Sequence, residues 1–171
     1  MRPSTVRVWL TVILLTAGVT GFFEMPRLRA ADKDDVTEAF KAFQAALKAK
    51  DAAKVYGLLD SASQKAADRS AGLIRAAYAK ASDDQKAKME KALGLAGAEL
   101  AKLTGEGFLK TKRFQGKYDE VPGSKVEKVT VQGNRATVFY IEPDQDHEKL
   151  QLNKQQGKWK VSAPMPLVAV Q

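Results

Sequence analysis

The densest group of side chains capable of chemistry lies between Glu142 and Glu148, where four carboxylates and one imidazole fall within seven residues. Carboxylate oxygens gathered in a loop are typical ligands of calcium. The segment lacks the glycine and the distal glutamate of the helix–loop–helix calcium motif, and Pro143 with its polar neighbours is also typical of a turn. We therefore expect a solvated hairpin tip here, and we predict no metal site and no cofactor.

Proton-transfer chemistry would require a carboxylate beside a hydroxyl donor in one cavity. Asp60 and Glu142 are the candidates for an acid or a base, and Tyr56 is the candidate donor beside them. The chain has one histidine and no cysteine, which excludes thiol nucleophiles, disulfides and two-histidine metal sites. A small-molecule isomerase or hydrolase is therefore an alternative function, and no residue is assigned a catalytic role.

A basic segment interleaved with aromatic residues lies between Phe108 and Tyr118. Its cationic members are Lys110, Lys112, Arg113 and Lys117. Such a pattern is typical of surfaces that bind single-stranded nucleic acid, and the same charges would hold an anionic cell-envelope polymer. A strand or loop with one solvated face also produces it. Because the chain opens with the layout of an export signal, we do not expect nucleic acid as a partner, and polymer binding is a second alternative.

Residues 1–31 carry that export signal. Two arginines and no acid precede an apolar stretch, Val8–Phe23, and charge resumes at Glu24. The stretch is shorter than the roughly 20 residues that a membrane-spanning helix needs. We expect residues 1–31 to be a signal peptide and residues 32–171 to form one domain, exported to the periplasm or the exterior. An uncleaved signal would instead tether that domain to the membrane through residues 8–23.

The composition is that of a single globular domain. The 171 residues are 44% hydrophobic and 28% charged, which provides enough apolar side chains for a core and argues against a disordered chain. The formal net charge of +8 is a mild basic excess. Such an excess favours solubility and weak attraction to anionic surfaces without naming a partner.

Apolar residues recur every three or four positions through the first half of the domain, which is typical of one buried helical face. The pattern predicts helices over residues 36–49, 55–59, 64–81 and 82–104. Ser82 and Gln85 have the spacing of a capping box, which marks the start of the last of these helices. Gly105 is expected to end it.

Beyond Gly105 the apolar period changes from about 3.6 to 2, so we expect strands in the rest of the chain. The expected strands are 108–118, 126–131, 136–142, 150–153 and 158–162. Hairpin turns are expected at Gly133-Asn134 and at Gln155-Gly157. Helices followed by antiparallel strands in one chain define an α+β domain, with the helices packed on one face of the sheet.

Four segments resemble the nuclear transport factor 2-like superfamily. Residues 42–51 (AFQAALKAKD) and 55–60 (VYGLLD) are similar to its opening helices, and residues 133–138 (GNRATV) and 157–161 (GKWKV) are similar to its final strands. The resemblance implies a cone-shaped α+β fold, with N-terminal helices packed on a curved antiparallel sheet, as in small exported bacterial domains of unassigned function. Residues 64–104 depart from the simpler members, because two long helices stand where a short helix and an early strand are usual.

The same superfamily includes ketosteroid isomerase, which pairs an aspartate base with a tyrosine that binds the oxyanion. The resemblance places Phe43 where that family has the tyrosine and Ala67 where it has the base. A phenyl ring donates no hydrogen bond and a methyl group accepts no proton, so this mechanism does not carry over. Scytalone dehydratase, another relative, relies on cavity histidines, of which this chain offers only His147.

The large side chains of the first two helices and of the strands are expected to face one another, and they are the candidates for lining a pocket. They are Phe40, Phe43, Tyr56, Val138, Tyr140 and Trp159. The same spacing also suits a filled core. We predict an exported, non-catalytic binding or accessory domain, whose partner is a small apolar ligand or another cell-envelope protein. The apolar segment 163–171 is expected to extend a sheet edge, to form a contact within a homodimer, or to hang free.

Overall fold

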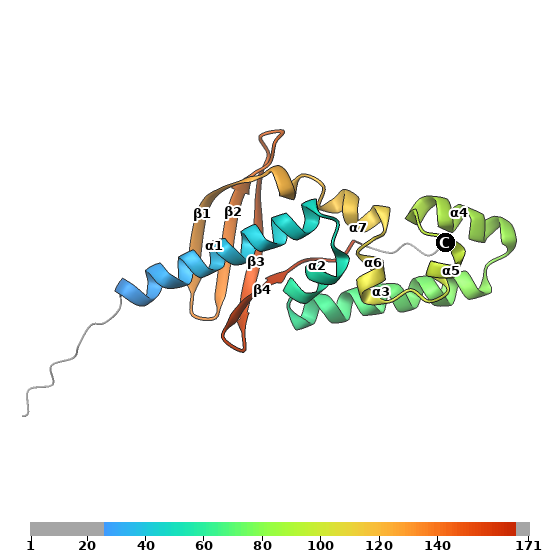
Figure 1. The fold of residues 1–171 in the computed structure, drawn as a ribbon, viewed down its shortest axis with the longest axis horizontal. Helices are drawn as coiled ribbons and strands as arrows, with labels where there is room; N and C mark the ends of the chain where they lie inside the picture. The colour runs from blue at the N-terminus through green and yellow to red at the C-terminus, as the bar shows by residue number, and fades with distance from the viewer. Residues whose placement is uncertain (1–25, 167–171) are drawn as a thin grey trace, which may run out of the picture.

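The computed structural model describes residues 26–166. One long helix lies across a face of a four-stranded sheet, and the other helices, including a second long one, gather mostly beyond one end of that sheet (Figure 1). The helices are α1 (Pro26–Lys48), α2 (Ala52–Leu58), α3 (Ser61–Lys80), α4 (Asp83–Leu93), α5 (Gly97–Leu100), α6 (Gly105–Phe108) and α7 (Lys112–Lys117), followed by the 3-10 helix η1 (Val121–Gly123). The strands are β1 (Lys125–Gln132), β2 (Arg135–Ile141), β3 (His147–Gln155) and β4 (Lys158–Ser162). This order confirms the α+β class.

Helix α1 supplies the layer that covers the sheet. Val36, Phe40 and Phe43 recur at intervals of four and three residues, and all three are fully buried. The helix ends in a Schellman motif, in which the Lys50 N–H donates to the Leu47 carbonyl and the Asp51 N–H donates to the Ala46 carbonyl. The predicted buried face is confirmed, and the helix begins ten residues before the expected start at position 36.

The sheet is an antiparallel meander in the order β1-β2-β3-β4, so β2 and β3 are the central strands. Both predicted hairpins are confirmed. Gly133 turns the first with a φ of 58°, while Gln156 and Gly157 turn the second with φ values of 50° and 77°. Along β2, buried Ala136, Val138 and Tyr140 face α1 and alternate with half-buried side chains on the opposite face.

Helices α2 to α7 form the helical half of the molecule. This half joins the sheet at Asp60, where α2 and α3 meet. Leu59 pairs with Val161 in a parallel bridge, and the Asp60 N–H donates to the Val161 carbonyl at 2.8 Å. The Ala163 N–H donates to the Ser63 hydroxyl at 2.9 Å. The start of α3 is therefore bonded to the far edge of the sheet at two points.

The capping box at Ser82 and Gln85 is confirmed, but the predicted helix from 82 to 104 is wrong in its extent. Gly94 adopts a φ of 70° and ends α4, and the chain then forms the one-turn helix α5. Gly94 is a helix-ending glycine in the left-handed region, which is where a side chain is disfavoured. The prediction used Gly105 as the stop and overlooked the earlier glycine.

The prediction of strands from residue 105 onward is wrong for 105–123, and 108–118 forms no strand. Thr104 caps α6 by accepting from the Gly107 N–H, and Thr111 caps α7 by accepting from the Phe114 N–H. Thr111, Phe114 and Tyr118 are buried at spacings of three and four, which is a helical face. The alternation of Phe and Lys that suggested a strand is incidental to that face.

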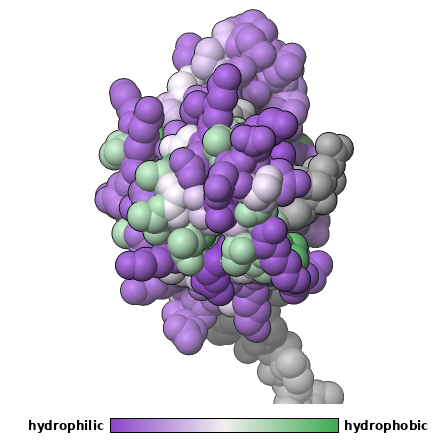
Figure 2. All heavy atoms as spheres, turned by 90° about the vertical axis from the view of Figure 1, so that its right-hand side faces the viewer, coloured by the Kyte–Doolittle hydropathy of each residue, from purple (hydrophilic) through white to green (hydrophobic). Residues whose placement is uncertain are grey.

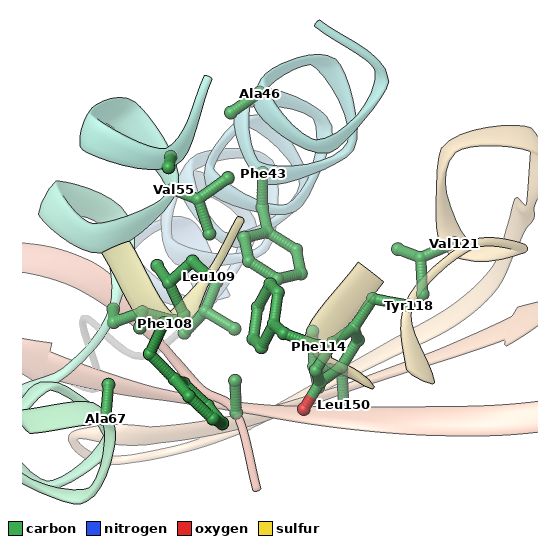
Figure 3. Packing of buried hydrophobic residues seen from close by; sticks show 14 of the residues in the cluster. Phe43, Ala46, Val55, Ala67, Phe108, Leu109, Phe114, Tyr118, Val121 and Leu150 are labelled. Atoms are coloured by element: carbon green, nitrogen blue, oxygen red, sulfur yellow. The ribbon is translucent and has the colours of Figure 1, made fainter. Parts of the chain in front are cut away.

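The core continues from the sheet into the helical half without a break. Figure 3 shows Phe43 of α1 directed toward Phe114 and Tyr118, with Leu109 and Val55 beside them. The Phe114 and Tyr118 ring centroids are 4.9 Å apart. At the end of the molecule formed by the helical half, the surface is mostly hydrophilic with scattered apolar groups (Figure 2).

The sequence predicted a signal or anchor at the N-terminus and an apolar segment, residues 163–171, at the C-terminus. The predicted signal or anchor lies outside the described residues as far as position 25, and no helix within 26–166 is long and apolar enough to cross a membrane. At the other end, the Pro164 carbonyl accepts from the Tyr118 hydroxyl at 2.8 Å. Residues 163–164 are therefore docked on the domain, and 167–171 lie outside the described residues.

Candidate functional site

Five of the six side chains predicted to line a pocket lie together in the core between α1 and the sheet. The Phe40 and Tyr140 ring centroids are 5.3 Å apart, and Val138 fills the sheet face beside them with no exposed surface. Burial, together with the charges of Glu142 and Glu148, raises the pKa of Tyr140 to about 12. These residues form the filled core that their spacing also allowed.

Tyr56, the sixth of those residues, lies apart from this group. Its hydroxyl donates to a carboxylate oxygen of Asp68 at 3.0 Å, on the side of α2 that faces α3. Partial burial and the bond to Asp68 raise the pKa of the Tyr56 hydroxyl, so the group stays protonated and donating. Tyr56 therefore links two helices and packs against the edge of the core, and it does not line the pocket described below.

Asp60, one of the two acid–base candidates, is buried and acts as the cap of α3. Its carboxylate accepts from the Ser63 N–H at 2.7 Å and from the Asn153 amide at 2.8 Å. Burial raises the pKa of this carboxyl, but hydrogen bonds from Ser63, Asn153 and Ser162 together lower it by more, and the net pKa lies below its usual value. Both oxygens are engaged, so Asp60 is a poor proton acceptor.

Glu142, the other candidate, belongs to an acidic cluster at the tip between β2 and β3. One carboxylate oxygen from each of Glu120, Glu142 and Asp144 lies within 4.8 Å of the others, and one buried oxygen of Glu120 has no hydrogen-bond partner. Burial and the neighbouring carboxylates raise the pKa values of Glu120 and Glu142. Sequence reasoning placed Glu142 and Asp144 in one loop, but it missed Glu120 because η1 brings that residue in from elsewhere.

The two candidate acids do not share a site. Asp60 bonds to Asn153, which stands opposite Arg135 at the start of β2, whereas Glu142 follows the last residue of β2. A strand rises about 3.3 Å per residue, so the length of β2 separates the two carboxylates by roughly 20 Å. A pair that exchanges protons with one substrate must lie within hydrogen-bonding reach of it, so these acids do not form such a pair.

A pocket of about 430 Å³ lies where the end of α1, the start of α2 and α7 meet. We call it the α7 pocket. Its lining comprises Leu47, Lys48, Lys50, Ala52, Val55, Leu109, Lys112, Phe114, Gln115, Gly116, Tyr118, Asp119 and Pro122. None of the six side chains predicted to line a pocket is among them.

The floor of the α7 pocket is apolar because it is the outer edge of the core. Val55, Leu109 and Phe114 are buried there, and Leu47 packs against them from α1. Burial raises the pKa of the Tyr118 hydroxyl, which also donates to the Pro164 carbonyl and is therefore uncharged. The floor consequently offers hydrocarbon and aromatic surface.

The rim of the α7 pocket is cationic. Lys48, Lys50 and Lys112 contribute to the lining and are exposed, although the Lys112 ammonium also donates to the Lys91 carbonyl of α4 at 3.4 Å. Asp119 is the one carboxylate in the described lining. Lys50 holds a φ of 53°, in the left-handed region that favours glycine, because it ends α1 in the Schellman motif. This turn therefore fixes the backbone position of Lys50 at the mouth of the pocket.

The predicted basic segment is divided by the helix that it forms. Lys112 lines the α7 pocket and Lys110 lies in the turn before α7, whereas Lys117 is exposed with its ammonium 5.9 Å from the Tyr118 ring centroid. Arg113 is half-buried. Arg113 and Lys117 are four residues apart on α7 and share one face of that helix, whereas Lys112 is the member of this group that lines the pocket.

Comparisons of the chain with protein-family models, with curated proteins and with solved structures found no match. The site must therefore be interpreted from its own chemistry. The α7 pocket presents an apolar floor, a cationic rim and a single exposed carboxylate, which suits binding more than proton transfer.

Proposed function

We propose that this protein is an exported, non-catalytic binding domain whose α7 pocket holds a small molecule with an apolar body and an anionic group. The observation that carries the proposal is the pocket of about 430 Å³ with a buried apolar floor and three lysines at its rim. Ligand pockets in proteins range from about 300 to 1,000 Å³, so this one suits a small ligand.

The floor and the rim support different parts of the ligand. Each methylene group transferred from water to the floor contributes about 0.8 kcal/mol, and Phe114 with Leu109 supplies the surface that receives it. An anionic group at the mouth lies near Lys48, Lys50 and Lys112, where an exposed charge pair contributes about 0.2–1 kcal/mol. A medium-chain carboxylate meets both requirements.

Two further parts of the proposal rest on the sequence. The arginines and apolar stretch of residues 1–23 support export, and the similarity of four segments to the nuclear transport factor 2-like superfamily supports membership of that group. The non-catalytic role is supported by Asp60, which is fully engaged as a cap, and by Glu142, which lies at the opposite end of the sheet.

Titration calorimetry with two amphiphiles of nearly equal tail length tests the proposal. We expect decanoate to bind and decyltrimethylammonium, which carries the opposite charge, to bind more weakly or not at all. Lys112→Gln should weaken decanoate binding about two- to five-fold. Lys110→Gln is the matched control, since it removes the same charge at an exposed position two residues away, outside the pocket, and it should leave the affinity unchanged. Equal binding of both amphiphiles, or of neither, contradicts the proposal.

A further inference from the structure

The sheet face opposite α1 carries an unusual concentration of cations. Residues that stand directly opposite in the strand register lie on one face, so the register identifies the side chains that point away from the core. The cations of this outer sheet face are Lys125, Lys128, Arg135, Lys149, Lys158 and Lys160. Two carboxylates lie beside these cations: Glu127 at the β1 bulge contacts His147 at 3.3 Å, and Asp60 accepts from Asn153 at 2.8 Å.

Most of these cations are available to a partner. Lys125, Lys128, Arg135, Lys149 and Lys158 are exposed. The Lys160 ammonium donates to the Gly57 carbonyl and is already engaged. Helix α1 covers the opposite face, where the buried residues of β2 point, and the junction of α2 and α3 contacts the outer face at Asn153, Gln155 and Lys160.

The cations of the outer sheet face are spread over it in two dimensions. Lys128, Phe139 and Lys149 form one row across β1, β2 and β3, and Arg135 and Asn153 begin a second row near the other end of β2. With strands about 4.8 Å apart and residues about 3.3 Å apart, the cations from the Lys125 row to the Lys158 row span roughly 15 Å by 26 Å. Phe139 is half-buried between the flanking lysines, with the Lys128 ammonium 6.0 Å from its ring centroid.

A shallow depression of about 230 Å³ lies within this face beside Arg135. Thr130, Thr137 and Gln151 contribute hydroxyl and amide donors to its lining. Guanidinium and hydroxyl groups together are typical of sites that receive a phosphate oxygen. The depression is therefore suited to bind one phosphodiester group among the surrounding cations.

We propose that the outer sheet face docks on the surface of an anionic phospholipid bilayer. A bilayer surface presents phosphate groups in two dimensions, which matches cations that are spread over all four strands. A linear polymer would instead need a single stripe or groove of cations along its path. Each lysine near such a surface contributes attraction that salt screens. Phe139 supplies an apolar group at the centre of the contact, at the level of the headgroups.

Sedimentation with vesicles tests this proposal, using the full chain so that residues 1–31 contribute equally to every variant. We expect the wild-type protein to bind vesicles containing phosphatidylglycerol more tightly than pure phosphatidylcholine vesicles, and the difference to shrink between 50 mM and 500 mM salt. Lys128→Gln/Lys149→Gln should weaken binding to the anionic vesicles about ten- to thirty-fold.

The matched control is Lys110→Gln/Lys117→Gln, which makes the same change in net charge at exposed positions away from the sheet and also removes one ammonium–ring contact. We expect it to weaken binding less than threefold. Equal weakening by the two double variants would overturn the proposal, because net charge alone would then explain binding. Binding of soluble polyphosphate without binding of the anionic vesicles would also overturn it, in favour of a polymer partner.

Discussion

The replacement Asp60→Ala tests how the helical half is attached to the sheet. Asp60 caps α3, accepts from Asn153 of β3, and donates its own N–H to Val161 of β4. The replacement keeps the backbone bond and removes the bonds that the carboxylate accepts from Ser63, Asn153 and Ser162. It therefore measures what one buried side chain contributes to the joint.

The expected loss is calculated from the bonds of the Ser63 N–H and the Asn153 amide. Loss of an aspartate cap costs about 0.5–2 kcal/mol, and a donor left unpaired in buried surroundings costs about 1–3 kcal/mol. The Ser63 N–H is buried and the Asn153 amide is half-buried, so we expect a loss of about 2–4 kcal/mol in the free energy of unfolding. For a domain of this size the fall in Tm is roughly 5–15 °C.

Urea denaturation followed by circular dichroism gives the measurement, and Asp51→Ala is the control. Asp51 caps α2 by accepting from the Lys54 N–H at 3.0 Å, but it is exposed, so its loss should cost about 1 kcal/mol or less. Because the pKa of Asp60 is lowered in the folded state, its contribution is present at neutral pH and is lost as the pH falls below the ordinary aspartate value of about 3.9. The reasoning fails if Asp60→Ala costs no more than Asp51→Ala at pH 7, or if the deficit of Asp60→Ala is undiminished at pH 2.5.

Three further predictions concern the backbone and the acidic tip. Lys50→Gly should raise the free energy of unfolding by up to about 1 kcal/mol in urea denaturation, because glycine adopts the φ of 53° without strain. Gly57→Ala should stabilise α2 by about 0.5–1 kcal/mol, since no atom lies within 4 Å of the added carbon. Gly105→Ala should cost about 1–3 kcal/mol, since the added carbon would lie 2.9 Å from the Asp68 backbone nitrogen. Thermal melting should show a higher Tm for Gly57→Ala and a lower Tm for Gly105→Ala. Glu120→Gln should stabilise the protein at pH 7 and have little effect at pH 4, because a raised pKa means that stability is lost as the pH rises and the carboxylate ionises; equal effects at both pH values would contradict this.

The sequence predicted the elements in which local pattern and tertiary burial agree. Val36, Phe40 and Phe43 lie on one helical face whatever that helix packs against, and they are the residues that α1 buries. Gln156 and Gly157 form a two-residue turn that needs positive φ, so the register of the second hairpin followed from the turn chemistry. Both features are fixed within about ten residues of chain.

The α7 pocket and the acidic cluster depend on contacts between distant segments, which is why no local pattern predicted them. The pocket combines Leu47 with Phe114, and residue 114 was itself assigned to a strand. Glu120 approaches Glu142 only because η1 turns the chain just before β1. The caps at Thr104 and Thr111 were the sequence signal that could have revealed the helices of this region, since a threonine one residue before a helix commonly caps it.

The charges of the outer sheet face would also keep the sheet from associating with other strands, and the sign of those charges distinguishes this role from the proposed binding role. An open sheet face with Phe139 and Ile141 on a central strand would favour association with other exposed strands, and flanking charges prevent this. Protection from association requires charge of either sign, and acidic residues improve solubility more than basic ones. The described strands nevertheless place six cations and one glutamate on this face. Solubility alone does not explain that bias, whereas an anionic partner does.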